Sequence, residues 1–285
     1  MKIFLTGGTG FIGSHFINQA QNEGHTLICL KRKNSKTRIP LNNQPIWLEG
    51  DLDTNFDKSV FEGIDVFVHL AAHSANVPYD TLENCIYWNV NASLRIFDIA
   101  REVGISNYLV AGSCFEYGRS GERYENIPPD APLEPTMTYP TSKAMLSTML
   151  HGWTAVNNVK LKYLRIFQVF GEGEAETRFY PSLKKAALEG KDFPMTKGEQ
   201  IRDFNNVEDV VKNFLMELDF SDVKCGNPIF KNIGSGKPQS VKVFANYWWK
   251  QWDAKGKLLF GVLDYRQNEV MRFVPVICNE TDCNE

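Results

Sequence analysis

The stretch Leu5-Thr6-Gly7-Gly8-Thr9-Gly10-Phe11-Ile12-Gly13 decides the fold. An apolar run at 3–5 is typical of a buried strand, and residues 11–22 have the apolar spacing of a helix. The three glycines spaced G-x-x-G-x-x-G allow a sharp turn, close approach of a pyrophosphate to the backbone, and tight packing of helix on strand. The N–H groups and dipole at the helix start attract that anion. The stretch predicts a dinucleotide site formed by Gly7, Thr9, Gly10, Phe11, Ile12 and Gly13.

The chain outward from this loop alternates short apolar runs with helical patterns. Unbroken apolar strands between helices indicate a parallel sheet covered on both faces, so we expect a doubly wound α/β fold of the Rossmann type. We expect residues 1–170 to bind the dinucleotide and residues 171–285 to form a smaller α+β lobe for the substrate, with some later elements crossing between them. The expected strands are 3–5, 26–30, 46–48, 65–71, 108–111, 161–169 and 257–263, and the expected helices are 11–22, 81–103, 139–155, 180–189, 207–218 and 242–252.

Composition excludes several classes of protein. Of the 285 residues, 43% are hydrophobic and 23% are charged, which is ordinary for a soluble globular protein. The net charge is −3 and the isoelectric point about 6.0, so no basic field argues for a nucleic-acid partner. No apolar run reaches the roughly 18–20 residues of a membrane span, and the N-terminal run is too short for a signal peptide. The six cysteines are therefore expected to be reduced thiols in a cytoplasmic protein.

The end of the second expected strand reads Leu30-Lys31-Arg32-Lys33-Asn34-Ser35-Lys36. Folds specific for NAD place a carboxylate here for the ribose 2′-hydroxyl, and folds specific for NADP place arginine near the 2′-phosphate. This run contains no acid. We therefore expect NADPH, held by Lys31 and Arg32, while NAD and a merely solvated basic loop stay open as alternatives.

Two further segments carry groups that can move a proton. Ser113 follows the strand expected at 108–111, and Tyr139 and Lys143 stand at the start of the helix expected at 139–155. Because residues four apart share a helix face, the Lys143 ammonium can lie beside the Tyr139 phenol and lower its pKa from about 10. Such a phenol can exchange a proton with a carbonyl or alcohol oxygen, and Ser113 can hydrogen-bond the same oxygen. We expect these three residues to be catalytic; the alternative is that Tyr139 is only a core residue.

In these motifs the chain resembles the extended short-chain dehydrogenases/reductases that act as nucleotide-sugar epimerases and dehydratases. The resemblance spans nearly the whole chain and includes Asn89-Val90-Asn91 and the run 164–171. It implies that Asp51 and Leu52 hold the adenine and that Lys143 holds the nicotinamide ribose. It also implies a cofactor path lined by Ala71, Ala72 and Phe167. His73 is expected beside the nicotinamide or the substrate, with a structural role as the alternative.

The same resemblance implies the nucleotide-sugar site. Gln200-Ile201-Arg202-Asp203-Phe204 and Tyr265-Arg266-Gln267-Asn268-Glu269 match two family motifs whose arginines hold a nucleotide diphosphate. A guanidinium suits that role because its planar fork meets two phosphate oxygens. The alternative is that Arg202 and Arg266 each form only an ion pair at the protein surface. The expected substrate-binding residues are Cys114, Phe115, Gln168, Arg178, Arg202 and Arg266; no metal site is expected.

Cys114 and Phe115 stand where the family's 4,6-dehydratases carry an Asp-Glu pair, so dehydration is disfavoured. The basic run at 31–33 departs from the 4-epimerases, which usually have an acid there. Details of the later motifs resemble CDP-4-dehydro-6-deoxyglucose reductases. We therefore expect NADPH-dependent reduction of the 4-keto group of a nucleotide-diphosphate 4-keto-6-deoxy sugar, CDP-linked for preference, in lipopolysaccharide O-antigen synthesis. A nucleotide-sugar 4-epimerase and a non-catalytic NADP-sensing protein are the alternatives. The resemblance also implies a homodimer through the helices at 81–103 and 139–155.

Overall fold

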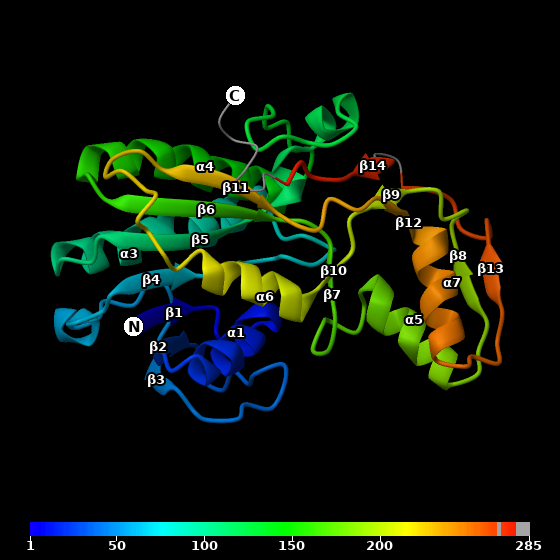
Figure 1. Cartoon of the computed structure of the whole chain (residues 1–285), viewed down its shortest axis with the longest axis horizontal. Coiled ribbons are helices and arrows are strands. Elements are labelled where there is room, and N and C mark those ends of the chain that lie inside the picture. Colours follow the sequence, from blue (N-terminus) through cyan, green and yellow to red (C-terminus); the bar gives the residue numbers. More distant parts are fainter. Residues whose placement is uncertain (267–268, 278–285) are drawn as a thin grey trace.

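The computed structural model describes residues 1–266 and 269–277. Its centre is a parallel sheet in the order β11-β6-β5-β4-β1-β2-β3 (Figure 1). The chain builds outward from β1 to β3 and then returns to the other side of β1, which confirms the doubly wound order. The strands of this sheet are β1 Lys2–Thr6, β2 Thr26–Lys31, β3 Ile46–Glu49, β4 Val66–His69, β5 Asn107–Ser113, β6 Lys160–Ile166 and β11 Ile229–Ile233.

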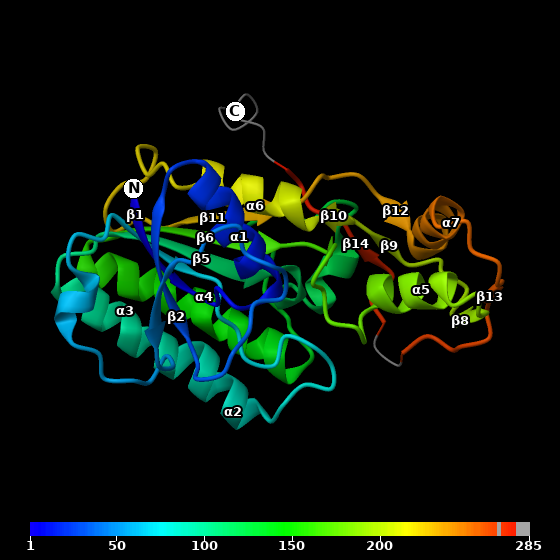
Figure 2. The ribbon, with the colours of Figure 1, turned by 90° about the horizontal axis from the view of Figure 1, so that it is seen from below.

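Helices cover both faces of this sheet (Figure 2). The side chains of β1 alternate between two apolar cores, because successive residues of a strand point to opposite faces. Ile3 and Leu5 pack with α1 Phe11–Asn22 and α6 Val207–Met216, while Phe4 belongs to the core on the opposite face. That second core is completed by α3 Ala92–Glu102 and α4 Thr138–Asn157.

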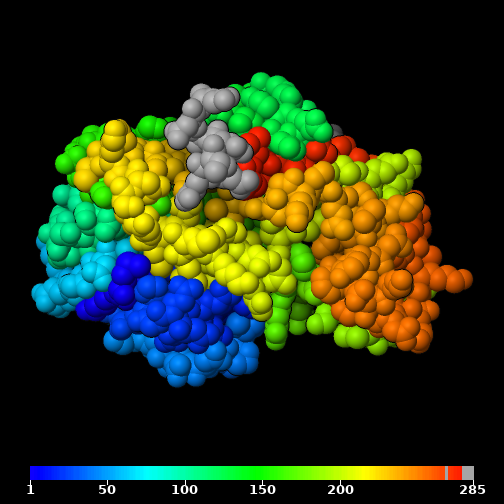
Figure 3. Space-filling view, viewed as in Figure 1, coloured from blue at the N-terminus to red at the C-terminus, as the bar shows by residue number. Residues whose placement is uncertain are grey.

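The second half of the chain contributes to both parts of the molecule. β11 closes one edge of the large sheet, and α6 packs on α1. Most of the remaining elements form a lobe beside it, whose visible face is largely orange in the space-filling view (Figure 3). The lobe has its own apolar core. Its elements are α5 Phe179–Leu188, β8 Phe193–Met195, β9 Ile201–Arg202, β12 Gln239–Ser240, α7 Val241–Gln251, β13 Leu258–Phe260 and β14 Arg272–Phe273.

Two of the expected elements are divided or shortened in the structure. The strand expected at 161–169 ends at Ile166; the chain then leaves the sheet, and β7 Val169–Phe170 pairs with β10 Asn205–Asn206. The helix expected at 81–103 is divided into α2 Leu82–Ile86, a π-helical turn at Tyr87–Asn91, and α3. The wide turn carries the buried Asn89, whose side chain bonds both the backbone after β4 and the Ser142 hydroxyl of α4. Such turns occur frequently at functional sites.

Three structural findings bear on the class of protein. Within the described residues, no helix is long and apolar enough to cross a membrane. In the same part of the chain, no group of three or more His, Cys, Asp or Glu side chains could hold a metal ion. Cys29, Cys85, Cys114 and Cys225 are free thiols, and Cys278 and Cys283 lie outside the described residues.

Candidate active site

The glycine loop between β1 and α1 is tightly packed. Gly7 has a φ of +79°, and a Cβ atom on it would lie 2.5 Å from the Ala71 nitrogen. A Cβ atom on Gly13 would lie 2.1 Å from the Gly7 carbonyl oxygen. Gly10 is the N-cap residue of α1 and offers no side-chain hydrogen bond to it. The backbone N–H groups of the first helical turn therefore remain available to an anion. Side chains at these glycine positions would fill the space in the loop. Without them, the loop fits the pyrophosphate of a dinucleotide. Thr9, Phe11 and Ile12 lie on the same loop and first turn.

A pocket at the end of β2 is lined by three cations, Lys31, Lys36 and Arg38, together with Ser35, Thr37 and Trp47. The Arg38 backbone N–H donates to the Ser14 hydroxyl at 3.0 Å, which ties this loop to α1. The Lys31 ammonium lies 3.8 Å from the Glu49 carboxylate and 5.4 Å from the centre of the Trp47 ring. Arg32 is exposed and does not line the pocket.

The expected adenine and nicotinamide residues follow β3 and β4. The Asp51 carboxylate accepts bonds from the Asp53 N–H and the Thr54 hydroxyl, both at 3.0 Å, which closes a tight turn. His73 is held on two sides: its Nε2 lies 2.7 Å from the Asp80 carboxylate, and its backbone N–H donates to Asn89 at 2.7 Å.

Leu52, Ala71, Ala72 and Phe167 also lie just beyond strands of the large sheet. Leu52 packs against the second core, and Ala71 and Ala72 follow β4. Phe167 is buried, and its backbone N–H donates to the Ile233 carbonyl at 3.0 Å. The expected cofactor residues therefore share the carboxyl edge of the sheet, where open α/β folds bind their ligands.

Ser113, Tyr139 and Lys143 meet at this edge and are all buried. Burial raises the pKa of the Tyr139 phenol, the charge of Glu116 adds to that rise, and a hydrogen bond with the Ser113 side chain opposes it. Burial lowers the pKa of Lys143 to about 8, and the charge of Glu116 opposes that fall. The Lys143 ammonium donates to the Ala111 carbonyl at 2.7 Å. The expected lowering of the Tyr139 pKa by Lys143 is therefore wrong in this structure, because burial dominates and the ammonium is bonded elsewhere.

Tyr79, which the sequence analysis did not single out, lies beside Tyr139. Its ring lies 5.5 Å from the ring of Tyr139. Burial raises the pKa of the Tyr79 phenol, and the charges of Arg178 and Arg266 oppose that rise. No spacing pattern singles out Tyr79, because it stands in the irregular segment after β4.

The two expected phosphate arginines differ in their surroundings. Arg202 is mostly buried and donates to Glu269 at 2.7 Å and to the Val270 carbonyl at 2.7 Å. Arg266 is exposed. Burial raises the pKa of the neighbouring Cys114 thiol to about 12, so that side chain is neutral at physiological pH.

Phe115 and Gln168 complete the expected substrate residues. The Phe115 ring packs edge-on against the Phe273 ring, with centroids 6.0 Å apart. The Gln168 backbone carbonyl accepts from the Asn205 N–H at 2.8 Å, and Gln168 is half-buried.

Known proteins resemble this chain over most of its length. The model of the NAD dependent epimerase/dehydratase family matches residues 3–233. The chain belongs to this family. It is therefore an enzyme of the nucleotide-sugar epimerase/dehydratase type.

Curated relatives include both epimerases and a dehydrogenase. A UDP-glucose 4-epimerase of Corynebacterium glutamicum is 26% identical over 260 residues, which are 85% of this chain and 78% of the relative. The dTDP-6-deoxy-L-talose 4-dehydrogenase (NAD(+)) of Aggregatibacter actinomycetemcomitans is 24% identical over 277 residues, 95% of this chain and 98% of the relative. A solved structure of MoeE5 with UDP-glucose and NAD shares the fold, with a TM-score of 0.81 at 24% identity over 97% of this chain and 90% of that one.

Proposed function

We propose that this enzyme uses NADPH to reduce the 4-keto group of a nucleotide-diphosphate 4-keto-6-deoxy sugar. The observation that carries the proposal is the pocket at the end of β2, where Lys31, Lys36 and Arg38 supply three cations and the lining contains no carboxylate. A 2′-phosphate carries negative charge that such a pocket attracts, whereas a free ribose 2′-hydroxyl is ordinarily recognised by an acid. Net reduction consumes one NADPH in each turnover, so it requires a cofactor that is released and exchanged.

The residues after Ser113 support reduction without dehydration. Removal of water across C5 and C6 of the sugar needs an acid and a base near those carbons. Cys114 is buried and neutral, and Phe115 has no group that can move a proton. The relative matched over nearly its whole length is named as a 4-dehydrogenase of a dTDP-6-deoxy sugar, which also favours redox chemistry at C4.

NADPH, when bound along the glycine loop, supplies the hydride. Tyr139 then donates its phenolic proton to the oxygen at C4, which develops negative charge, and Ser113 hydrogen-bonds the same oxygen. Lys143 holds the nicotinamide ribose. Arg202, Arg266 and Arg178 bind the diphosphate and orient the sugar. We place CDP-linked sugars first among the substrates to test, because the later sequence motifs resemble those of CDP-4-dehydro-6-deoxyglucose reductases. Sugars linked to dTDP and GDP are tested beside them.

The alternative function is a 4-epimerase that keeps its cofactor through the catalytic cycle. It is favoured by the names of relatives such as the Corynebacterium glutamicum UDP-glucose 4-epimerase. The two functions differ in whether cofactor is consumed.

The deciding experiment incubates the purified protein with CDP-, dTDP- and GDP-4-keto-6-deoxy sugars and with UDP-glucose, following NADPH absorbance and the sugar products. Stoichiometric loss of NADPH with one of the keto sugars is the expected result. Interconversion of UDP-sugars without net cofactor loss would replace the reductase by the epimerase, and no turnover of any sugar would favour a cofactor-sensing protein.

The proposed homodimer is supported by apolar side chains exposed on the helices that would form it. Leu82 and Tyr87 are about two-fifths exposed, and so is Met145 on α4. Light scattering of the purified protein at several concentrations tests this, with a mass near 65 kDa, twice the 32.5 kDa of one chain, as the expected value.

A further inference from the structure

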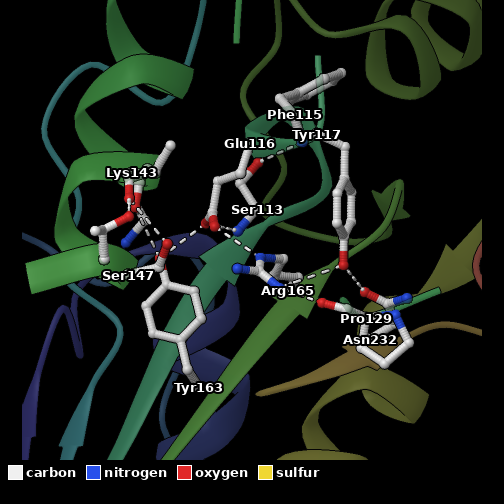
Figure 4. A network of polar contacts seen from close by, with 12 residues as sticks. Ser113, Phe115, Glu116, Tyr117, Pro129, Lys143, Ser147, Tyr163, Arg165 and Asn232 are labelled. Atoms are coloured by element: carbon white, nitrogen blue, oxygen red, sulfur yellow. Dashed lines mark hydrogen bonds and ion pairs between the residues drawn. The ribbon is translucent and has the colours of Figure 1, made fainter. Parts of the chain in front are cut away.

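A buried carboxylate lies directly under the three catalytic residues proposed above. Glu116 ends the short 3-10 helix Cys114–Glu116 that follows β5, and its side chain is completely buried. Its Oε1 accepts from the Ser113 N–H at 2.8 Å and from the Tyr163 hydroxyl at 2.8 Å, and its Oε2 accepts from Arg165 Nε at 2.8 Å (Figure 4). The Ser113 hydroxyl in turn accepts from the Phe115 N–H at 3.3 Å, so Ser113 and Glu116 form a reciprocal capping box.

The guanidinium that faces Glu116 is itself anchored. Arg165 is nearly fully buried on β6, and its Nη1 donates to the Pro129 carbonyl at 2.8 Å. Its guanidinium also lies over the ring of Tyr117, at 5.1 Å from the centroid. The Tyr117 hydroxyl donates to Asn232 of β11 at 2.6 Å. The segment 113–117 is thereby fastened to β6, to β11 and to the loop before α4.

Tyr163 links Glu116 to Lys143, because its hydroxyl lies 2.8 Å from Glu116 Oε1 and 3.2 Å from the Lys143 backbone carbonyl oxygen. The pKa of Lys143 is lowered by burial, and Glu116 opposes that fall. The other titratable groups packed around the ammonium are neutral. His69 of β4 has its pKa lowered well below the usual value by burial and by Lys143. Tyr139 and Tyr163 have theirs raised by burial, and the ring centre of Tyr163 lies 6.0 Å from the ammonium.

Burying an ion pair costs desolvation free energy, and a well-packed apolar pair is often at least as stable. A stabilising role alone therefore does not account for the Glu116–Arg165 pair. Replacement of Glu116 by a neutral residue would leave the buried Arg165 guanidinium without its counter-charge. The Glu116 carboxylate can thus act on two residues at once: on Ser113 through a hydrogen bond and on Lys143 through its charge.

We propose that Glu116 is a positioning residue for the reaction: it fixes Ser113 through the backbone amide and supplies the negative charge that keeps Lys143 an ammonium. This inference rests on the proposed function, because it takes Ser113, Tyr139 and Lys143 as the catalytic group. Arg165 pairs with Glu116 and holds its second oxygen.

The test is Glu116→Gln, which keeps the size of the side chain and an oxygen for the Ser113 amide but removes the charge. The titration of Lys143 is followed by NMR of lysine labelled with ¹³C at Cε, and its resonance is identified by its loss in Lys143→Arg. We expect the midpoint to move from near 8 in the wild type to at least about one pH unit lower in the variant.

The pH profile of kcat gives the second readout. Since an ammonium is needed at position 143, the rate falls as pH rises through the pKa of Lys143, and this basic limb should move to lower pH in Glu116→Gln. A shift of one unit lowers the protonated fraction at pH 8 about five-fold and changes it little at pH 6. Tyr163→Phe is the matched control, because it removes one hydrogen bond to the same carboxylate and leaves every charge in place. Its Lys143 midpoint should equal that of the wild type.

An unchanged Lys143 midpoint in folded Glu116→Gln would overturn the proposal and leave Glu116 with a packing role only. If the single variant fails to fold, Glu116→Gln combined with Arg165→Met removes both members of the ion pair, and the same downward shift is expected. The NMR midpoint does not depend on turnover. Absence of activity in the wild type would therefore refute the proposed function, while the titration would still decide the role of Glu116.

Discussion

Glu174→Gln should stabilise the protein at pH 8 and leave its stability unchanged at pH 5. Glu174 lies in the turn after β7, and its side chain is only 5% exposed. Its Oε1 lies 3.3 Å from Arg178 Nε, and its Oε2 is buried without a hydrogen-bond partner among the described residues. Burial raises the pKa of this carboxyl from 4.5 to about 7, although Arg178 opposes the rise.

The sign follows from proton binding. Because the folded-state pKa lies above the unfolded-state pKa, the folded protein binds more protons between these two values. The free energy of unfolding therefore falls as pH rises from 4.5 through about 7, and the cost of the buried charge is fully present above that range. The difference between the two pKa values corresponds to about 3 kcal/mol at most.

The polar atom that glutamine leaves buried without a partner is left so by the protonated wild-type carboxyl as well, so this cost cancels in the comparison. The net gain at pH 8 is therefore about 2–3 kcal/mol, or a rise in Tm of about 4–10 °C for a chain of this size. At pH 5 the wild-type carboxyl is protonated in the folded state, so the two side chains are nearly equivalent.

Thermal and urea unfolding at pH 5 and pH 8 measure this difference, and effects of other titrating groups cancel because both proteins carry them. Glu176→Gln is the matched control, since Glu176 lies in the same turn but is exposed. It should change Tm little at either pH. Equal effects of Glu174→Gln at both pH values, or a lower Tm at pH 8, would show that the buried carboxyl carries no such cost.

Three further predictions concern the proposed reaction. Tyr139→Phe should lower kcat about 10²–10⁴-fold with KM and NADPH affinity near wild type, measured by steady-state kinetics and cofactor titration; retention of half the kcat would remove Tyr139 from the mechanism. The pair Lys36→Ala and Arg38→Ala should weaken NADPH but not NADH in binding titrations, with Lys33→Ala, which does not line the pocket, as the control, and an equal loss for both cofactors would contradict the NADPH assignment. Arg266→Ala should raise KM for the nucleotide sugar without lowering Tm, and an unchanged KM would return this arginine to an ordinary surface role.

The strands of the large sheet were predictable where burial on both faces leaves an unbroken apolar run. This holds for β1, β4 and β5, which all lie in the middle of the sheet. β11 was missed, because its sequence Ile-Phe-Lys-Asn-Ile places two polar residues inside the strand. Lys231 of that strand is paired with Glu217, and Asn232 with Tyr117, contacts that no local pattern shows.

The Ser-Tyr-Lys group was predictable because its spacing is local and its order along the chain is diagnostic. Its electrostatic surroundings were not, since they come from residues distant in sequence that meet only in the fold. Arg165 approaches Glu116 from a strand about fifty residues later, and Tyr79 approaches Tyr139 from the loop after β4. The S-x-x-E spacing from Ser113 to Glu116 was the one available signal, because it is the pattern of a capping box.

The ionisation of the site supports the proposed direction of the reaction. A phenol whose pKa is raised by burial is a proton donor at neutral pH, and it is a poor base until a cation approaches it. Reduction of a ketone begins with a protonated Tyr139, whereas an epimerase must first remove a proton from the C4 hydroxyl. The Lys143 ammonium is bonded to the Ala111 carbonyl, and the Glu116 charge further disfavours a Tyr139 anion. Burial and the nearby charges therefore keep Tyr139 protonated, which is the state from which the proposed reduction starts.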